Sequence, residues 1–95
     1  MKITNNTLIK RRKSVIYKSV DGVVYLLDTA NSTIHTLNKT ASFIWEYLEK
    51  THTFKTVVDA MCENFEIKQK AAAKDCAEFI SDYIKLGFLE TGKAS

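Results

Sequence analysis

The sequence predicts an α+β fold in which a three-stranded antiparallel β-sheet is followed by three helices. Up to about residue 37 the apolar residues cluster in short β-prone runs, and beyond it they recur at helical spacing. An Asp-Gly pair separates the first two of those runs, which is a strong hairpin signal. The 95 residues, 45% of them hydrophobic, suffice for one domain with one modest core.

The first half of the chain is expected to form a meander. Ser14–Val20 and Val23–Leu27 are rich in β-branched and other apolar residues, and Asp21-Gly22 lies between them. Asp-Gly suits a type I′ turn because that turn needs positive φ at both central residues. Asp28–Asn31 is expected to form a second turn and Ser32–Leu37 a third strand.

Both ends are expected to lie outside a domain formed by residues 14–90. Residues 1–13 are polar and basic and are expected to form a loose basic arm, and residues 91–95 a short tail. The run Lys10-Arg11-Arg12-Lys13 supplies most of the net charge of +3. Such a run could touch nucleic acid or a membrane, although four charges on a terminal arm are usually only solvated.

Three helices are expected after the third strand. Asn38 and Thr53 are suited to cap the first two, since each side chain can accept a free amide hydrogen of the first turn. The third helix spans about residues 69–86, and Gly87 suits its left-handed end. The apolar stripes are Leu37, Ala41, Ile44, Trp45 and Leu48; Phe54, Val57, Val58, Met61, Cys62 and Phe65; and Ala72, Cys76, Phe79, Ile80, Tyr83 and Ile84. Three short helices and a hairpin resemble a winged helix-turn-helix unit.

Several classes of function are disfavoured by the sequence. No apolar run approaches the roughly 18 residues that cross a bilayer, and the first residues lack the features of a signal peptide, so a cytoplasmic location is expected. Cys62 and Cys76 are expected to be reduced thiols, and with His35 and His52 they lack the paired spacing of a zinc site. There is no Gly-rich phosphate loop and no recognisable catalytic spacing around either histidine. We expect no catalysis, no metal and no cofactor.

Nucleic-acid binding is the alternative that a winged helix raises. A DNA-reading third helix normally exposes Lys, Arg, Asn or Gln to phosphates and base edges. Here Asp75, Glu78 and Asp82 share one face of that helix, and they would repel a phosphate backbone. A solvated helix face explains the same carboxylates without any function.

The third strand indicates peptide binding instead. Ser32–Leu37 contains neither a charge nor a proline, the devices that usually protect an edge strand. An extended segment could pair with it by main-chain bonds while alternate side chains enter pockets beside the third helix. Phe79 and Leu86 lie at the border between that helix's apolar stripe and its acidic face, although Phe79 is equally well explained as core. An open edge can also pair with its own copy, so a homodimer is a further alternative.

Several segments resemble PqqD-like proteins, which are named for the peptide chaperone of pyrroloquinoline quinone biosynthesis. The family signature Leu-Asn-x-Thr-Ala/Gly-x-x-Ile-Trp is matched within Thr33–Trp45. Val24–Asp28 is similar to the family's second strand. Asp75–Ile80 and Leu86–Leu89 resemble its closing helix and its Gly-hydrophobic-Leu ending. The resemblance covers about residues 14–90.

The resemblance implies a standalone recognition element for ribosomally synthesised and post-translationally modified peptides (RiPPs), of lasso type or similar. In that family the domain binds the leader region of a precursor peptide as an added strand and presents it to a leader peptidase, cyclase or radical SAM enzyme. From the residues, no nucleic-acid, membrane or cofactor binding is expected. Carried over by position, the peptide contacts would come from Thr33, Ile34, His35, Thr36, Asp75, Phe79 and Asp82, with Tyr25 and Leu27 on the floor of the groove. Which face of the third helix borders the groove is left open.

Overall fold

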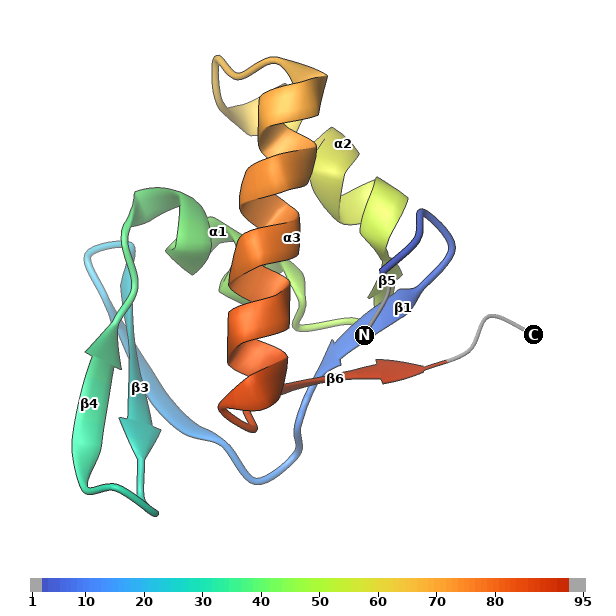
Figure 1. Ribbon diagram of the computed structural model, residues 1–95. Coiled ribbons are helices and arrows are strands. Elements are labelled where there is room, and N and C mark those ends of the chain that lie inside the picture. Colours follow the sequence, from blue (N-terminus) through green and yellow to red (C-terminus); the bar gives the residue numbers. More distant parts are fainter. Residues whose placement is uncertain (1–2, 93–95) are drawn as a thin grey trace.

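The computed structural model describes residues 3–92 as two small antiparallel sheets and three helices (Figure 1). The elements in chain order are β1 (Leu8–Arg11), β2 (Ile16–Val20), β3 (Val23–Asp28), β4 (Thr33–Thr36), α1 (Lys39–Tyr47), β5 (His52–Thr53), α2 (Phe54–Asn64), α3 (Gln69–Lys85) and β6 (Leu89–Gly92). The predicted α+β fold, a three-stranded antiparallel sheet followed by three helices, is confirmed.

The expected meander is the sheet β2-β3-β4. Leu27 pairs with Ile16 on one side and with Ile34 on the other. Asp21 and Gly22 have φ values of 52° and 80°, so the predicted type I′ turn is confirmed. Because side chains alternate along a strand, this sheet has an inner face toward the helices, where β3 buries Val24, and an outer face that points away from them.

A second sheet, of order β5-β1-β6, was not expected. The prediction of a loose arm over residues 1–13 is wrong for Leu8–Arg11, which forms the central strand and buries Ile9 completely. The predicted tail likewise begins inside β6. Lys10 and Arg12 lie 3.2 and 3.7 Å from the carboxylate of Glu90, so the basic run is held by the opposite end of the chain.

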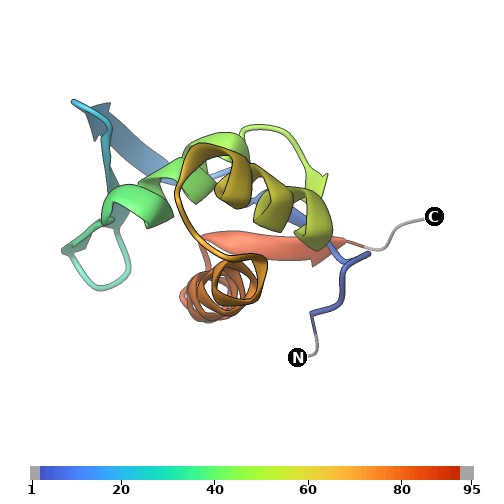
Figure 2. The ribbon, with the colours of Figure 1, turned by 90° about the horizontal axis from the view of Figure 1, so that it is seen from above.

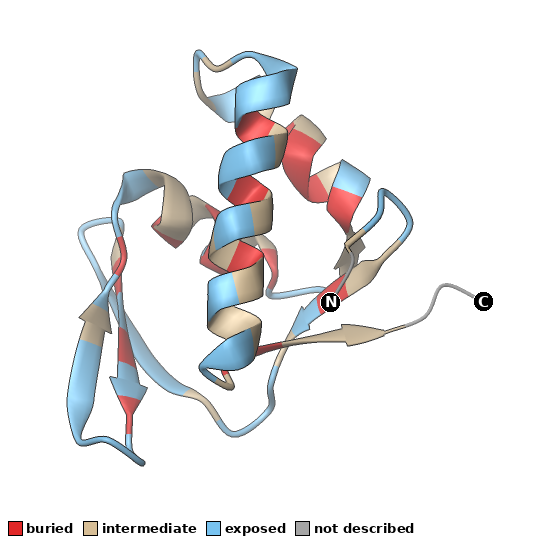
Figure 3. Cartoon of the chain, viewed as in Figure 1, coloured by how far each residue is buried: buried red, intermediate tan, exposed pale blue. Residues whose placement is uncertain are grey.

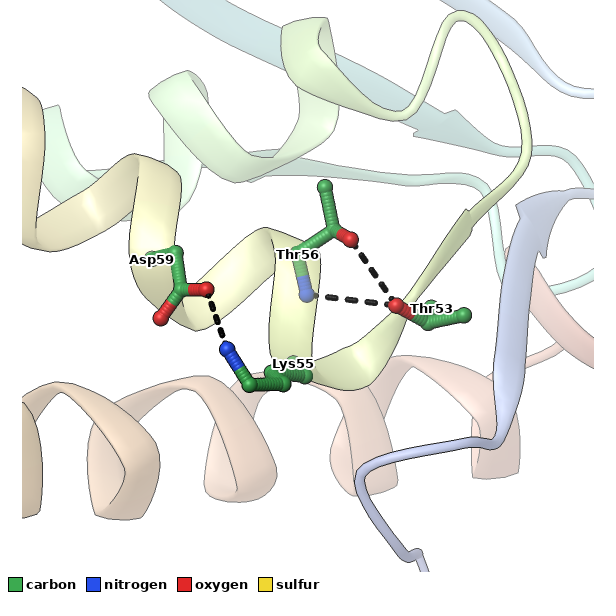
Figure 4. A network of polar contacts seen from close by, with 4 residues as sticks. All are labelled: Thr53, Lys55, Thr56 and Asp59. Atoms are coloured by element: carbon green, nitrogen blue, oxygen red, sulfur yellow. Dashed lines mark hydrogen bonds and ion pairs between the residues drawn. The ribbon is translucent and has the colours of Figure 1, made fainter.

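The helix ends follow the predicted caps. The side chain of Asn38 accepts a hydrogen bond from the backbone N–H of Ala41 at 2.9 Å, and that of Thr53 accepts one from Thr56 at 3.2 Å (Figure 4). In the first turns of α2, Lys55 forms an ion pair with Asp59, four positions later. Gly87, with φ of 89°, follows α3 and turns the chain into β6.

The core lies between the helices and the two sheets. Figure 2 shows α3 end-on, with α1 and α2 along one side of it. Buried positions line the inner sides of the helices and strands (Figure 3). The largest fully buried side chains are Trp45, Ile9, Leu26, Ile44, Leu48, Met61, Ile80 and Leu89. Among residues 3–92, none of the helices has both the length and the apolar character that crossing a membrane requires.

Candidate functional site

The strand β4 is an open edge of its sheet. It lies outermost in the order β2-β3-β4, and Figure 1 shows β3 on one side of it only. The two chain ends that might have covered it, β1 and β6, pair with each other in the other sheet. Within residues 3–92, therefore, no strand of the protein pairs with the outer side of β4.

The register shows which backbone groups of β4 are free. Leu37 N–H donates to the carbonyl oxygen of Val24 at 2.9 Å, so the backbone of Leu37 faces β3. Successive residues of an antiparallel strand direct their N–H and C=O groups alternately to either side. It follows that Thr33 and His35 also face β3, whereas Ile34 and Thr36 present their N–H and C=O groups to the open edge. Such groups accept an added strand.

A buried serine holds the end of this edge in place. Ser42 Oγ accepts a hydrogen bond from Val24 N–H at 3.0 Å and donates one to the carbonyl oxygen of Leu37 at 3.1 Å. The hydroxyl thereby continues the β3-β4 ladder by one step and ties it to α1. Sequence reasoning missed this positioning role; a small hydroxyl residue placed one turn after the cap Asn38 was the available signal.

A hollow of about 430 Å³ adjoins Thr36 and lies between the end of β4, α1 and α3. The lining residues are Thr36, Leu37, Asn38, Thr40, Ala41, Ile44, Asp75, Glu78, Phe79, Asp82 and Tyr83. The acidic face of α3 therefore borders the hollow. Asp75, Glu78 and Asp82 are exposed, and none of the three forms an ion pair within the described chain.

Aromatic rings form one wall of the hollow and join α3 to the sheet. The Phe79 and Tyr83 rings stack with centroids 4.4 Å apart. The ring of His35 lies with its centroid 6.0 Å from that of Tyr83 and 5.4 Å from that of Phe88. The prediction of His35 as a side-chain contact for a peptide is not supported by this placement, because its ring points inward between β4 and α3.

The turn that precedes β4 is held by a carboxylate. Asn31 donates to Asp28 from its side-chain amide at 3.0 Å and from its backbone N–H at 3.2 Å. The Asn31 side-chain hydrogen bond, with help from the backbone bond and from His35 at 3.6 Å, keeps the pKa of Asp28 below its usual value against an opposing effect of burial. This cluster fixes the other end of the edge strand.

Two predicted residues lie on the wrong side of the sheet to form the floor of the hollow. Tyr25 and Leu27 point to the outer face, because the alternate residues Val24 and Leu26 are fully buried on the inner one. The structure therefore does not place either side chain at the hollow. Thr33 is paired with Asp28 at the far end of β4. Of the predicted site residues, the structure brings together Thr36, Asp75, Phe79 and Asp82 around the hollow, with Ile34 beside them on the edge.

Two features of the described residues concern metal binding and the reactivity of a thiol. No group of three His, Cys, Asp or Glu side chains within residues 3–92 is placed to hold a metal ion. Cys76 is buried, and its burial raises the pKa of the thiol to about 12, so the thiol is protonated at neutral pH. A protonated, buried thiol is a poor nucleophile.

Comparisons with known proteins agree with this geometry. The chain resembles a solved structure described as "TbiB1 in Complex with the TbiA(beta) Leader Peptide", with a TM-score of 0.78, 27% identity, and coverage of 90% of this chain and 99% of that one. It shares its fold with "Lasso peptide synthetase B1 complexed with the leader peptide", at a TM-score of 0.74, 22% identity, and coverage of 86% and 96%. No curated protein matches. The profile of the family described as "Coenzyme PQQ synthesis protein D (PqqD)" matches residues 24–89, and the chain belongs to that family.

Proposed function

We propose that this protein captures the leader region of a ribosomally synthesised precursor peptide as a fourth strand on β4 and presents it to a modifying enzyme. The observation that carries the proposal is the pair of free backbone positions, Ile34 and Thr36, beside the hollow that α3 borders. The TbiB1 structure, which is similar over nearly the whole chain, was solved with a leader peptide and supports it. The protein itself performs no chemistry.

The hollow supplies what a strand edge lacks, namely selectivity for side chains. A guest strand directs alternate side chains toward α3, where Phe79 and Ala41 offer apolar contact. Burying one large apolar side chain contributes about 1.5–3 kcal/mol, and a micromolar affinity requires about 8 kcal/mol. Two or three anchors together with the ladder bonds therefore reach a useful affinity. Asp75 and Asp82 would favour a guest with Lys or Arg near its anchor residues.

The basic run leaves little free positive charge for binding nucleic acid, which is the alternative function. Lys10 and Arg12 are paired with Glu90. Arg11 donates to the carbonyl oxygen of Trp45, and its guanidinium carbon lies 4.9 Å from the Tyr17 ring centroid. Most of this charge is therefore engaged within the protein, and the acidic face of α3 repels phosphate. The proposal includes a cytoplasmic location and a product of lasso type.

A proline placed on the open edge tests strand addition. Thr36→Pro removes an outward N–H and should weaken binding of the cognate leader peptide about tenfold, from one lost hydrogen bond and a distorted edge. Ser19→Pro is the matched control, because the same alternation directs the Ser19 N–H to the open edge of β2, away from the hollow. Thr36→Ala controls for the side chain. Fluorescence anisotropy with a labelled leader peptide measures the affinities.

Leader affinity should fall only for Thr36→Pro. Circular dichroism should show that all three variants remain folded. If folded Thr36→Pro binds as tightly as the unchanged protein, the leader does not add to β4. An equal loss in Ser19→Pro would mean that the proline disturbs the whole sheet and would also contradict the proposal. Titration with duplex DNA at moderate salt tests nucleic-acid binding, the alternative function.

A further inference from the structure

A second hollow, of about 520 Å³, lies at the other end of β4 from the hollow beside Thr36. Three stretches of the chain border it: the link from β1 to β2, the turn that precedes β4, and the end of α3 with the residues that follow. In Figure 1 these stretches come together at the lower ends of β4 and α3. The residues that line it include Arg12, Lys13, Asp28, Thr29, Ala30 and Glu90.

A captured leader would reach this second hollow because β4 is short. The four residues of β4 span about 13 Å, so a longer guest continues past both ends of the strand. Past Thr36 the guest meets the first hollow, and past Thr33 it meets the turn that contains Thr29 and Ala30, and the end of α3. The second hollow therefore extends the groove in which the leader is proposed to lie.

The carboxylates of the second hollow already have partners within the protein. Asp28 accepts two hydrogen bonds from Asn31, at 3.0 and 3.2 Å. The carboxylate oxygens of Glu90 lie 3.2 Å from the side-chain nitrogen of Lys10 and 3.7 Å from that of Arg12. Neither carboxylate therefore depends on a cation from a guest.

Lys13 is the charge of the second hollow that has no partner. It is exposed, and within residues 3–92 it forms no ion pair. The end of α3 adds little negative charge, because the N–H groups of Gly87 and Phe88 donate to carbonyl oxygens of its last turn at 3.1 and 2.9 Å. The unpaired charge here is therefore positive, whereas that of the first hollow, beside Asp75 and Asp82, is negative.

We infer that the second hollow receives the part of the leader that continues past Thr33, and that Lys13 pairs there with an acidic side chain of the leader. This inference rests on the proposed leader capture and adds a requirement on the captured sequence. Backbone pairing alone allows a guest strand to run in either direction along an edge. Opposite charges at the two ends of β4 favour one direction, because the reverse direction would place like charges together.

Reversal of the charge at Lys13 tests the pairing in the full-length protein. Lys13→Glu should weaken binding of the labelled cognate leader peptide about fivefold in fluorescence anisotropy, because an exposed ion pair is replaced by two like charges. The loss should shrink as salt rises. Lys18→Glu is the matched control, since it makes the same change on β2, outside the second hollow, and should alter the affinity by less than about twofold.

The complementary change in the peptide identifies the residue that Lys13 contacts. The acidic residues of the leader are changed to Lys one at a time, and each peptide is titrated against Lys13→Glu and against the unchanged protein. One of these peptides should bind Lys13→Glu more tightly than it binds the unchanged protein. The same peptide should show no such preference for Lys18→Glu.

Nuclear magnetic resonance locates the leader independently of its affinity. The backbone amide signals of Thr29 and Ala30, which line the second hollow, should shift when the whole leader is added. They should keep their positions when the leader is shortened to the segment that pairs with β4, whereas the signal of Thr36 should shift with both peptides.

Three results would overturn the inference. These are equal effects of Lys13→Glu and Lys18→Glu, which would make Lys13 an ordinary solvated charge, the absence of a peptide that prefers Lys13→Glu, and amide signals of Thr29 and Ala30 that the whole leader does not move. Leader capture itself would still stand if Thr36→Pro weakened binding in the same experiments. Failure of the unchanged protein to bind the leader is a separate result, because it overturns the proposed function.

Discussion

The two edges of the β2-β3-β4 sheet have the same backbone chemistry but different surroundings. The edge of β2 exposes the N–H and C=O groups of Tyr17 and Ser19, as β4 exposes those of Ile34 and Thr36. Only β4 lies beside the hollow that α1 and α3 border, where Phe79 and the acidic residues are found. Free backbone groups alone do not distinguish one extended segment from another, so we expect the helix beside β4 to make that edge selective.

The largest expected effect is on stability. It follows from removing the Ser42 hydroxyl, which supports the β4 side of the sheet. Ser42→Ala leaves the backbone N–H of Val24 and the carbonyl of Leu37 without their partner in a buried place. An unsatisfied buried group costs about 1–3 kcal/mol, so the free energy of unfolding should fall by about 2 kcal/mol. Urea denaturation measures this, with Ser81→Ala on α3 as the control.

Leader affinity should fall as well, because Ser42 fixes the end of β4 next to the hollow. The edge of β2 lies one strand further from Ser42, so the substitution should leave the structure of that edge unchanged. An unchanged unfolding free energy in Ser42→Ala would show that the hydroxyl is not needed to complete the ladder.

A smaller effect concerns the charges beside β4. Asp82→Lys should weaken binding of a basic leader about fivefold, because an exposed ion pair contributes at most about 1 kcal/mol. The difference should shrink as salt rises. Glu63→Lys makes the same change of charge on an exposed part of α2, away from the hollow, and should have little effect. Equal effects of the two variants would show that the net charge matters and the position does not.

Local signals allowed most of the fold to be predicted. The Asp21-Gly22 turn, the caps Asn38 and Thr53 and the stop at Gly87 each depend on a few consecutive residues, and the structure confirms all four. The sheet of β1 and β6 joins residues about eighty positions apart. No local pattern reveals such a pairing, which is why the basic segment was taken for a loose arm.

The orientation of Tyr25 and Leu27, which differs from the expected one, has a physical cause in the composition of β3. Val23–Leu27 is apolar at every position, so the alternation that normally tells the buried face from the exposed one is missing. The edge strand and the acidic face of α3 were predictable because each follows from spacing. The orientation of Tyr25 and Leu27 was not, because both faces of this strand carry apolar side chains.

The smallest expected effect compares the two turns of the same meander. The hydrogen bond from Asn31 lowers the pKa of Asp28, so the carboxylate is favoured in the folded state. A lowered pKa adds stability above the usual value of 3.8, and that stability is lost as the pH falls through the folded-state pKa. Unfolding of the protein should therefore become easier at acidic pH, and Asp28→Asn should reduce this dependence. Asp21→Asn, the same substitution in the β2-β3 turn, is the control, since Asn also tolerates the positive φ there. Thermal melts at pH 3, 4, 5 and 7 measure the difference, and identical pH profiles for both variants would show that Asp28 does not hold the turn before β4.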